Sequence, residues 1–219
     1  MRTHYRQAGF TLVEIAIVLV IIGLLLGGIL KGQEMITQAR IKNVINDFNG
    51  VTAAYASYQD RYRAIPGDDQ GAGTRWAGAA AVPGDGDGVL AGAYNATPAF
   101  PPTAANEANL FWWHLRLAGF IPGPTTAAGA SNQPTNAFGG RLGAQAAGGA
   151  LGGMGGLIIC TAGIPDKVGI AVDTQMDDQA SASGSIRAAI DNNPNPLPAA
   201  AVATYVETGT NTYILCKGV

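Results

Sequence analysis

Charged residues are scarce in this sequence. Lysine, arginine, aspartate and glutamate make up 13% of its 219 residues, and the formal net charge is −2. There is no long basic run, so the sequence lacks the broad electrostatic footprint of a nucleic-acid-binding protein. Nucleic acid is therefore not an expected partner.

Residues that usually carry catalysis are also scarce. The two histidines are His4 and His114. The sequence contains no Ser/His/Asp set, no HExxH motif, no phosphate-binding loop and no Cys/His group with metal-ligand spacing. His114 lies in an apolar helical segment, where a lone histidine is usually a packing or surface residue. These absences predict that the chain is not an enzyme and needs no organic cofactor.

The N-terminus combines a short polar leader with a long apolar run. Residues 1–9 carry Arg2 and Arg6 and no acid, and residues 10–30 are almost entirely apolar. A helix of about 21 residues spans roughly 30 Å, enough to cross a bilayer core. A plain signal anchor and a cleaved secretory signal are the simple interpretations. The second is disfavoured, because such signals have apolar runs of about 7–15 residues and no small-residue cleavage site follows Leu30.

Glu14 is the exception within the apolar run. A carboxylate in a bilayer core costs on the order of a few kcal/mol and by default indicates function. Residues 10–30 offer it no cationic side chain. A free α-amino group created at Phe10 would supply a partner, in the same molecule or in a neighbour.

The sequence Gly-Phe-Thr-Leu-Val-Glu at residues 9–14, followed by the apolar run, resembles the class III signal of type IV pilins and type II secretion pseudopilins. The resemblance implies that a prepilin peptidase cuts after Gly9 and that the new N-terminal Phe10 is methylated. It also implies that Glu14 pairs with the terminal amine of an adjacent subunit during assembly. Many pilins have a proline in the membrane segment, whereas this chain has none before Pro66.

The same resemblance implies a location and partners. The precursor would lie in the inner membrane with its soluble domain in the periplasm, and copies would assemble, with dedicated machinery, into a homo-oligomeric filament outside the cell or in the periplasm. A type IV pilus subunit is the leading interpretation. A secretion pseudopilin and a minor or tip pilin with a binding role are the alternatives. Weaker resemblances to one group of proteobacterial pilin-like proteins lie at residues 62–68, 84–88, 111–119 and 172–188.

An amphipathic helix is predicted to continue beyond the apolar run. Apolar residues alternate at spacings of three and four, which places them on one stripe. They are Ile41, Val44, Phe48, Val51, Tyr55, Tyr58 and Tyr62. One helix is therefore expected over about residues 11–61. The stripe is either a coiled-coil seam or, as its short length and tyrosines favour, the face on which the chain's own soluble domain packs.

The rest of the chain predicts a soluble domain of the α+β class. Residues 65–100 are rich in turn residues and are expected to be loop rather than core. A helix is predicted over residues 104–118, with Thr103 as N-cap and Gly119 closing its end. Strands are expected at 157–160 and 212–216, and residues 168–173 are a short helix or strand. The predicted organisation is a leader at 1–9, a helix at 10–63 with its membrane part at 10–30, and a pilin-like domain at 64–219, in which a small antiparallel sheet packs on the long helix.

The two cysteines are a further candidate site. If the soluble domain lies outside the cytoplasm, as Arg2 and Arg6 favour, Cys160 and Cys216 can form a disulfide. Closing that loop of about 57 residues would stabilise the fold by roughly 4 kcal/mol, and two buried thiols are the alternative.

Asp85 and Asp87, separated by glycine, resemble the first half of a calcium-binding loop. The full twelve-residue loop fails, because Ala96 stands where the bidentate Glu is needed. A structural calcium site and a solvated turn remain the two interpretations. Asp177 and Asp178 form a second, weaker acidic pair.

Overall fold

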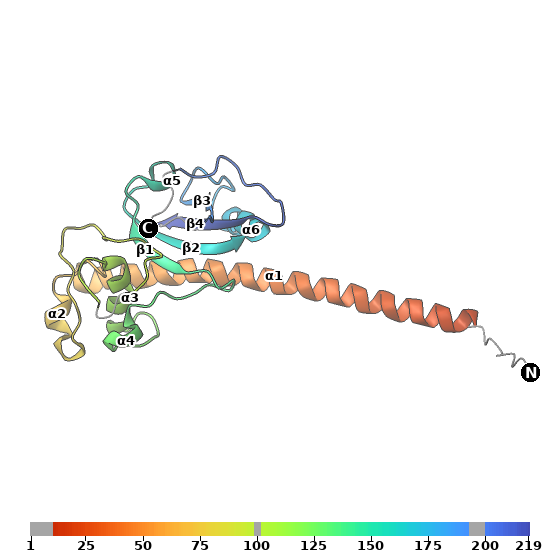
Figure 1. The fold of residues 1–219 in the computed structure, drawn as a ribbon, viewed down its shortest axis with the longest axis horizontal. Helices are drawn as coiled ribbons and strands as arrows, with labels where there is room; N and C mark the ends of the chain where they lie inside the picture. The colour runs from red at the N-terminus through yellow and green to blue at the C-terminus, as the bar shows by residue number, and fades with distance from the viewer. Residues whose placement is uncertain (1–10, 99–101, 193–199) are drawn as a thin grey trace, which may run out of the picture. The chain divides into compact units, whose positions relative to one another are not determined.

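A computed structural model describes residues 11–98, 102–192 and 200–219 (Figure 1). Its helices are α1 (Leu12–Tyr62), α2 (Ala72–Arg75), a 3-10 turn η1 (Ala77–Ala79), α3 (Glu107–Leu117), α4 (Ala127–Ala130), α5 (Ala150–Gly153) and α6 (Asp166–Met176). Its strands are β1 (Leu142–Ala146), β2 (Leu157–Pro165), β3 (Ile186–Ile190) and β4 (Thr212–Gly218). The protein is thus α+β, with a long N-terminal helix and a small antiparallel sheet. It divides into two compact units, with the boundary between Ala39 and Arg40.

The part of α1 in the first unit has no core of its own. It contains an 18-residue stretch with a mean hydropathy of 2.8, none of it buried, and this helix is long and apolar enough to cross a membrane. Leu12 is 86% and Leu24 73% exposed. Such a surface is costly in water, because each Å² of exposed apolar area forgoes about 25 cal/mol of burial.

The part of α1 in the second unit is amphipathic, as the spacing predicts. Its buried residues are Ile41, Val44, Phe48, Val51, Ala54 and Tyr58. They share one core with apolar residues of the sheet, α3 and α6. The stripe is therefore the packing face of the chain's own domain. Tyr55 and Tyr62 lie at its margin and are only partly buried.

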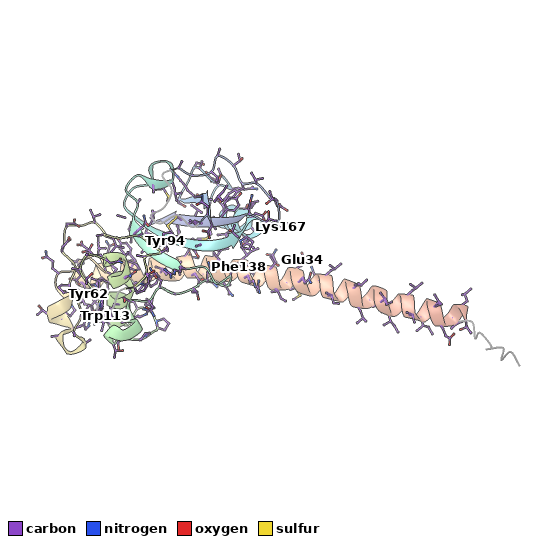
Figure 2. All side chains as sticks on the ribbon, viewed as in Figure 1. Glu34, Tyr62, Tyr94, Trp113, Phe138 and Lys167 are labelled. Atoms are coloured by element: carbon purple, nitrogen blue, oxygen red, sulfur yellow. A yellow bond between two sulfur atoms is a disulfide. The ribbon has the colours of Figure 1, made fainter. Side chains whose placement is uncertain are left out.

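The sheet has the strand order β1-β2-β4-β3, and every neighbouring pair is antiparallel. Alternate residues of the central strands face opposite sides, because the side-chain period of a strand is two. Ile159 and Leu215 belong to the core that contains α1. Ile158 and Ile214 belong to a second core, on the other face, with Tyr94 and Leu151. Tyr94, labelled in Figure 2, lies beside β1, where its N–H donates to Gln145 Oε1 at 2.9 Å.

The loop prediction for residues 65–100 was wrong in part. The segment contains α2 and η1, and it contributes Leu90 and Tyr94 to the two cores. Asp68 and Asp69 are also buried, at 5% and 4% exposure. Turn-forming composition gives the local conformation of such a chain, but it does not tell whether the turns lie on the surface.

The predicted helix at 104–118 begins later than expected. α3 starts at Glu107, with Asn106 rather than Thr103 in the N-cap position and no side-chain cap. Its end is as predicted: Gly119 has a φ of +78°, and Phe120 N–H donates to Leu115 O at 3.0 Å. This is the pattern that glycine permits after a helix.

Two strands were not predicted. β1 lies within the Gly/Ala-rich stretch and β3 follows the acidic pair, and neither has strong strand propensity along its whole length. Residues 168–173, left as helix or strand, are in α6. The turn that follows β1 is open: a side chain added at Gly148, Gly149 or Gly155 would meet nothing within 4 Å.

Candidate functional site

The start of α1 places Glu14 in a capping arrangement. Thr11 precedes the first helical residue, and its N–H and Oγ1 both donate to Glu14 Oε2 at 2.8 Å. Glu14 N–H in turn donates to Thr11 Oγ1 at 3.3 Å. This is the reciprocal capping box of the Thr-x-x-Glu type. That local role was available from the sequence but was missed, and it stands beside the predicted role in assembly.

The predicted processing residues, Gly9 and Phe10, lie outside the described residues. Glu14 therefore has a described position, whereas the amine predicted to pair with it does not. Within the described part of the N-terminal unit, no cationic side chain precedes Lys31, which forms an ion pair of 2.7 Å with Glu34.

Cys160 and Cys216 lie directly opposite each other on the central strands β2 and β4 and form a disulfide. Both are fully buried in the core on the sheet face away from α1. The bridge therefore joins two segments that are 56 residues apart in sequence.

His114 is a structural residue inside the domain. Its ring is 0% exposed, and Nδ1 accepts a hydrogen bond from Gly67 N–H at 2.9 Å while Nε2 lies 2.9 Å from Val82 O. The first bond requires an unprotonated Nδ1, so the second requires the proton on Nε2. Burial lowers the pKa of His114 to about 4. The ring holds together two loop segments, as the packing interpretation expects.

A carboxylate network neighbours His114. Asp69 Oδ2 accepts from Tyr58 OH at 2.6 Å and from Arg75 at 2.5 Å. Burial alone would raise the pKa of Asp69, but these hydrogen bonds outweigh it and hold the pKa below its usual value. Arg75 also lies over the Tyr62 ring at 4.2 Å. The network fastens the end of α1 to the loop that follows it.

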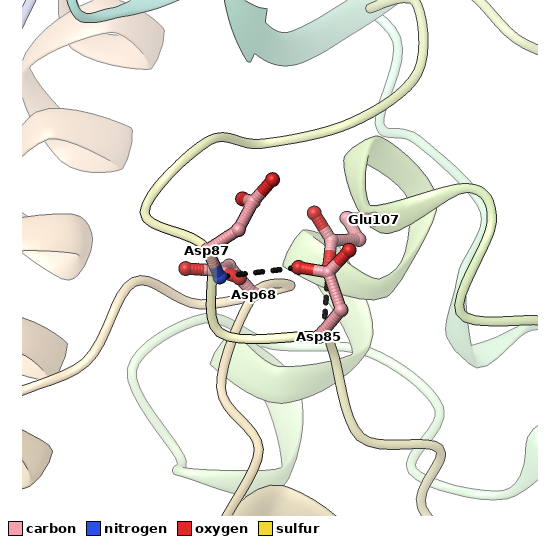
Figure 3. A group of neighbouring side chains, drawn as sticks. All are labelled: Asp68, Asp85, Asp87 and Glu107. Atoms are coloured by element: carbon pink, nitrogen blue, oxygen red, sulfur yellow. Dashed lines mark hydrogen bonds between the residues drawn. The ribbon is translucent and has the colours of Figure 1, made fainter.

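Four carboxylates converge between the loop after α1 and the start of α3 (Figure 3). They are Asp68, Asp85, Asp87 and Glu107, and one oxygen of each lies within 4.8 Å of those of the others. Asp85 and Asp87 were singled out from the sequence. Asp68 and Glu107 were missed as members of this group, because only the fold brings them to it.

Backbone N–H groups hold these carboxylates in place. Glu107 accepts from Asp85 N–H and Ala91 N–H, both at 2.9 Å. Asp68 Oδ2 accepts from Gly88 N–H at 3.0 Å. Burial, and to a lesser degree repulsion from the other carboxylates, raises the pKa of Asp68 and of Glu107. The arrangement concentrates negative charge that no cationic side chain in the described chain is shown to neutralise.

The loop can approach so closely because of glycine. A Cβ at Gly84 would stand 2.3 Å from Gly67 O and 2.4 Å from Asp68 C. Real Cβ atoms do not come that close to backbone, so residue 84 must lack a side chain for Asp85 to reach the group.

The second acidic pair also belongs to a group, formed by Asp173, Asp177 and Asp178. Here the buried member is satisfied. Asp173 accepts from Gln179 N–H at 3.2 Å and from Tyr205 OH at 2.7 Å. Asp177 accepts from Ile186 N–H at 2.8 Å. These contacts give the second group a structural role in shaping the turn between α6 and β3.

Comparison with known proteins identifies the N-terminal signal. Residues 4–30 match the family model of the prokaryotic N-terminal methylation motif. No curated protein and no solved structure matches the chain. The predicted resemblance to the class III signal of type IV pilins and pseudopilins is confirmed over these residues. The motif supports a pilin-like or pseudopilin-type protein with a membrane-anchored precursor.

Proposed function

We propose that the protein is a structural subunit of a type IV pilus or pilus-like filament, assembled through α1 after removal of residues 1–9. The observation that carries the proposal is the methylation motif at the head of a helix whose apolar residues are not buried in the chain itself. A bilayer covers such a helix in the precursor, and neighbouring copies of the same helix would cover it in a filament. No step in this role requires catalysis by the chain.

The proposed orientation places the second unit outside the cytoplasm. Arg2 and Arg6 precede the apolar run, and basic residues favour the cytoplasmic side. The Cys160–Cys216 disulfide is consistent with this, since disulfides persist mainly outside the reducing cytoplasm. The inner membrane, a prepilin peptidase and an assembly machinery are the proposed partners of the precursor.

Hydrophobic burial alone gives little driving force for α1 to move from the bilayer into a filament. Lipid tails are as apolar as the leucines and isoleucines of a neighbouring helix, so exchanging one for the other is nearly neutral. An ion pair between subunits would favour the filament over the bilayer. In the proposed mechanism, cleavage after Gly9 exposes the Phe10 amine, and Glu14 of one subunit binds the amine of the next. An ion pair in this low-dielectric setting is far stronger than one in water.

The processing claim is tested by intact mass and N-terminal analysis of sheared surface fractions. A mature species that starts at methylated Phe10, in filaments made mainly of this chain, is the expected result. Retention of residues 1–9 in surface material would contradict the processing step. Filaments confined to the periplasm would instead identify a secretion pseudopilin, and a trace amount in filaments of another subunit would identify a minor pilin.

The role of Glu14 is tested by two substitutions that separate its charge from its capping bond. Glu14→Gln can retain a capping box, because Gln also serves at this position, but it removes the charge. Glu14→Ala removes both. We expect both variants to insert and to be cleaved, and both to yield few filaments. If Glu14→Gln assembles normally and Glu14→Ala does not, Glu14 acts as a helix cap and the pairing mechanism is wrong.

A further inference from the structure

The four-carboxylate group joins three segments of the second unit that are distant in sequence. Asp68 follows the end of α1, Asp85 and Asp87 belong to the glycine-rich loop at residues 84–88, and Glu107 begins α3. Asp68 and Glu107 are buried, whereas Asp85 and Asp87 are exposed. The group therefore has a buried inner side and an outer side that solvent can reach.

The spacing of the four carboxylate oxygens fits a calcium ion. Calcium binds oxygen at about 2.3–2.6 Å, so two ligands on opposite sides of the ion are about 5 Å apart. The four oxygens lie within 4.8 Å of one another, inside that limit. Magnesium binds at about 2.0–2.1 Å and demands near-ideal octahedral geometry, whereas calcium accepts flexible arrangements of oxygens such as these.

Asp68 supplies the observation that points to a ligand. Its side chain is 5% exposed, and Oδ1 is buried with no hydrogen-bond partner, although Oδ2 accepts from Gly88 N–H. A buried oxygen without a hydrogen-bond partner destabilises the fold, and it does so more strongly when it is charged. The Asp68 carboxylate is one of the four that converge, so a cation bound among them would lie beside a buried carboxylate that still has an oxygen free to accept.

From this geometry we infer that Asp68, Asp85, Asp87 and Glu107 form a calcium-binding site. Calcium takes six to eight oxygens in flexible arrangements, so water on the exposed side completes the shell of the four carboxylates. The ion offsets their negative charge and ties the glycine-rich loop to α3 and to the segment after α1. The inference goes beyond the proposed function, because calcium binding by the isolated chain does not depend on filament assembly.

Calorimetry tests the inference. The full-length chain in detergent is first treated with a chelator and is then titrated with calcium. We expect one calcium ion per chain, with a Kd of about 10⁻⁴–10⁻³ M, the range of extracellular calcium modules. Magnesium is expected to bind at least about tenfold more weakly, because it demands a tighter shell. No saturable calcium binding up to about 10 mM, tenfold above that range, would overturn the site. Equal affinity for magnesium would overturn its assignment to calcium.

Variants locate the ion. The double variant Asp85→Asn with Asp87→Asn changes two exposed residues, so its folding is expected to survive. We expect it to lose more than about tenfold in calcium affinity, since even outer-shell partners of metal ligands are worth about 10–100-fold. The matched control is Asp178→Asn, in the second acidic group, which should bind calcium as the parent chain does.

The variants also provide the opposing outcome. If Asp178→Asn loses calcium binding while the double variant keeps it, the ion belongs to the second group and the inference is wrong. Asp68→Asn is a further check. It keeps the shape of the side chain that carries the unpartnered oxygen but removes its charge, so it is expected to bind calcium more weakly than the parent chain does. Tryptophan fluorescence and an intact disulfide establish that each variant is folded before its affinity is compared.

Discussion

Acidification is expected to destabilise the second unit through His114. The imidazole is fully buried, and its Nδ1 must remain unprotonated to accept the hydrogen bond from Gly67 N–H. Protonation would replace that acceptor with a donor facing another donor, and would place a charge in a site from which water is excluded. The native state therefore resists protonation, as the pKa of about 4 expresses.

The size and sign of the change in the free energy of unfolding follow from the difference between the pKa of His114 in the folded and in the unfolded state. The ordinary histidine pKa of 6.5 applies to the unfolded chain, and burial lowers it to about 4 in the folded one. As the pH falls from about 6.5 to 4, the unfolded state takes up a proton that the native state refuses. The stabilisation from neutral His114 is complete above pH 6.5 and is lost across this window. A gap of about 2.5 units corresponds to a loss of about 3 kcal/mol.

Urea unfolding of the full-length chain in detergent, monitored by tryptophan fluorescence, measures this loss. All three tryptophans, Trp76, Trp112 and Trp113, lie in the second unit, so the signal reports on that unit. The comparison is between the parent chain and His114→Gln, each at pH 7 and pH 4.

Two neighbouring carboxylates also contribute to the pH dependence. The pKa of Asp69 is held below its ordinary value of 3.8, so in the native state this carboxylate keeps its charge through the window and its loss adds to destabilisation at lower pH. Asp68, whose pKa is raised, opposes the destabilisation. Because these groups are present in both proteins, the difference between the two pH dependences isolates His114. We expect the parent chain to lose about 3 kcal/mol more than the variant. Equal losses in the two proteins would refute the assignment of acid sensitivity to His114, whatever the stability of the variant at pH 7.

The disulfide and the glycine contact give the remaining predictions. Replacing both cysteines, as Cys160→Ser with Cys216→Ser, should lower the free energy of unfolding by about 4 kcal/mol, since the bridge closes a long loop. Thiol counting under denaturing, non-reducing conditions should find no free thiol in the parent chain, and finding two would contradict the bridge. Gly84→Ala should destabilise by about 1–3 kcal/mol, because its Cβ would overlap Gly67 O. Its matched control, Gly50→Ala in α1, has open space around it and should instead stabilise by up to about 1 kcal/mol. Urea unfolding measures all of these changes, and equal effects of the two glycine substitutions would contradict the close-contact argument.

The long helix was readable from the sequence because its environment imposes a period on it. Burial on one side of the helix leaves apolar residues at spacings of three and four, which is how Ile41, Val44 and Phe48 were found. The central strands were readable for a similar reason. Their runs of apolar and β-branched residues, such as Leu157 to Cys160, are typical of strands buried on both faces.

The edge strands lacked such a signal. β1 reads Leu-Gly-Ala-Gln-Ala and is a strand because β2 offers it five pairing positions, from Leu142 to Ala146. Gly143 is needed there, since a Cβ would stand 1.9 Å from Tyr94 O. A contact of this kind depends on a segment almost fifty residues away, and local composition carries no record of it.

The candidate cation site also has one part that the local sequence predicts and one part that only tertiary contacts provide. The alternation of aspartate and glycine drew attention to Asp85 and Asp87, because that pattern places neighbouring oxygens on one turn. Asp68 and Glu107 come from other segments, and no local pattern links them to the aspartate-glycine alternation. The two carboxylate oxygens of Glu107 anchor the backbone of the loop. Tertiary contacts alone recruit such ligands.

The two glycine-rich segments of the second unit also differ as places to attach a reporter. Around Gly84 the backbone is in contact with Gly67 and Asp68, so a tag or an inserted epitope there would have to force the loop away from the segment that follows α1. Around Gly148 and Gly149 the backbone faces open space. Exposed loop tips with small residues accept insertions best. A label for following this protein in cells therefore belongs between β1 and β2, even though the two segments are similar in composition.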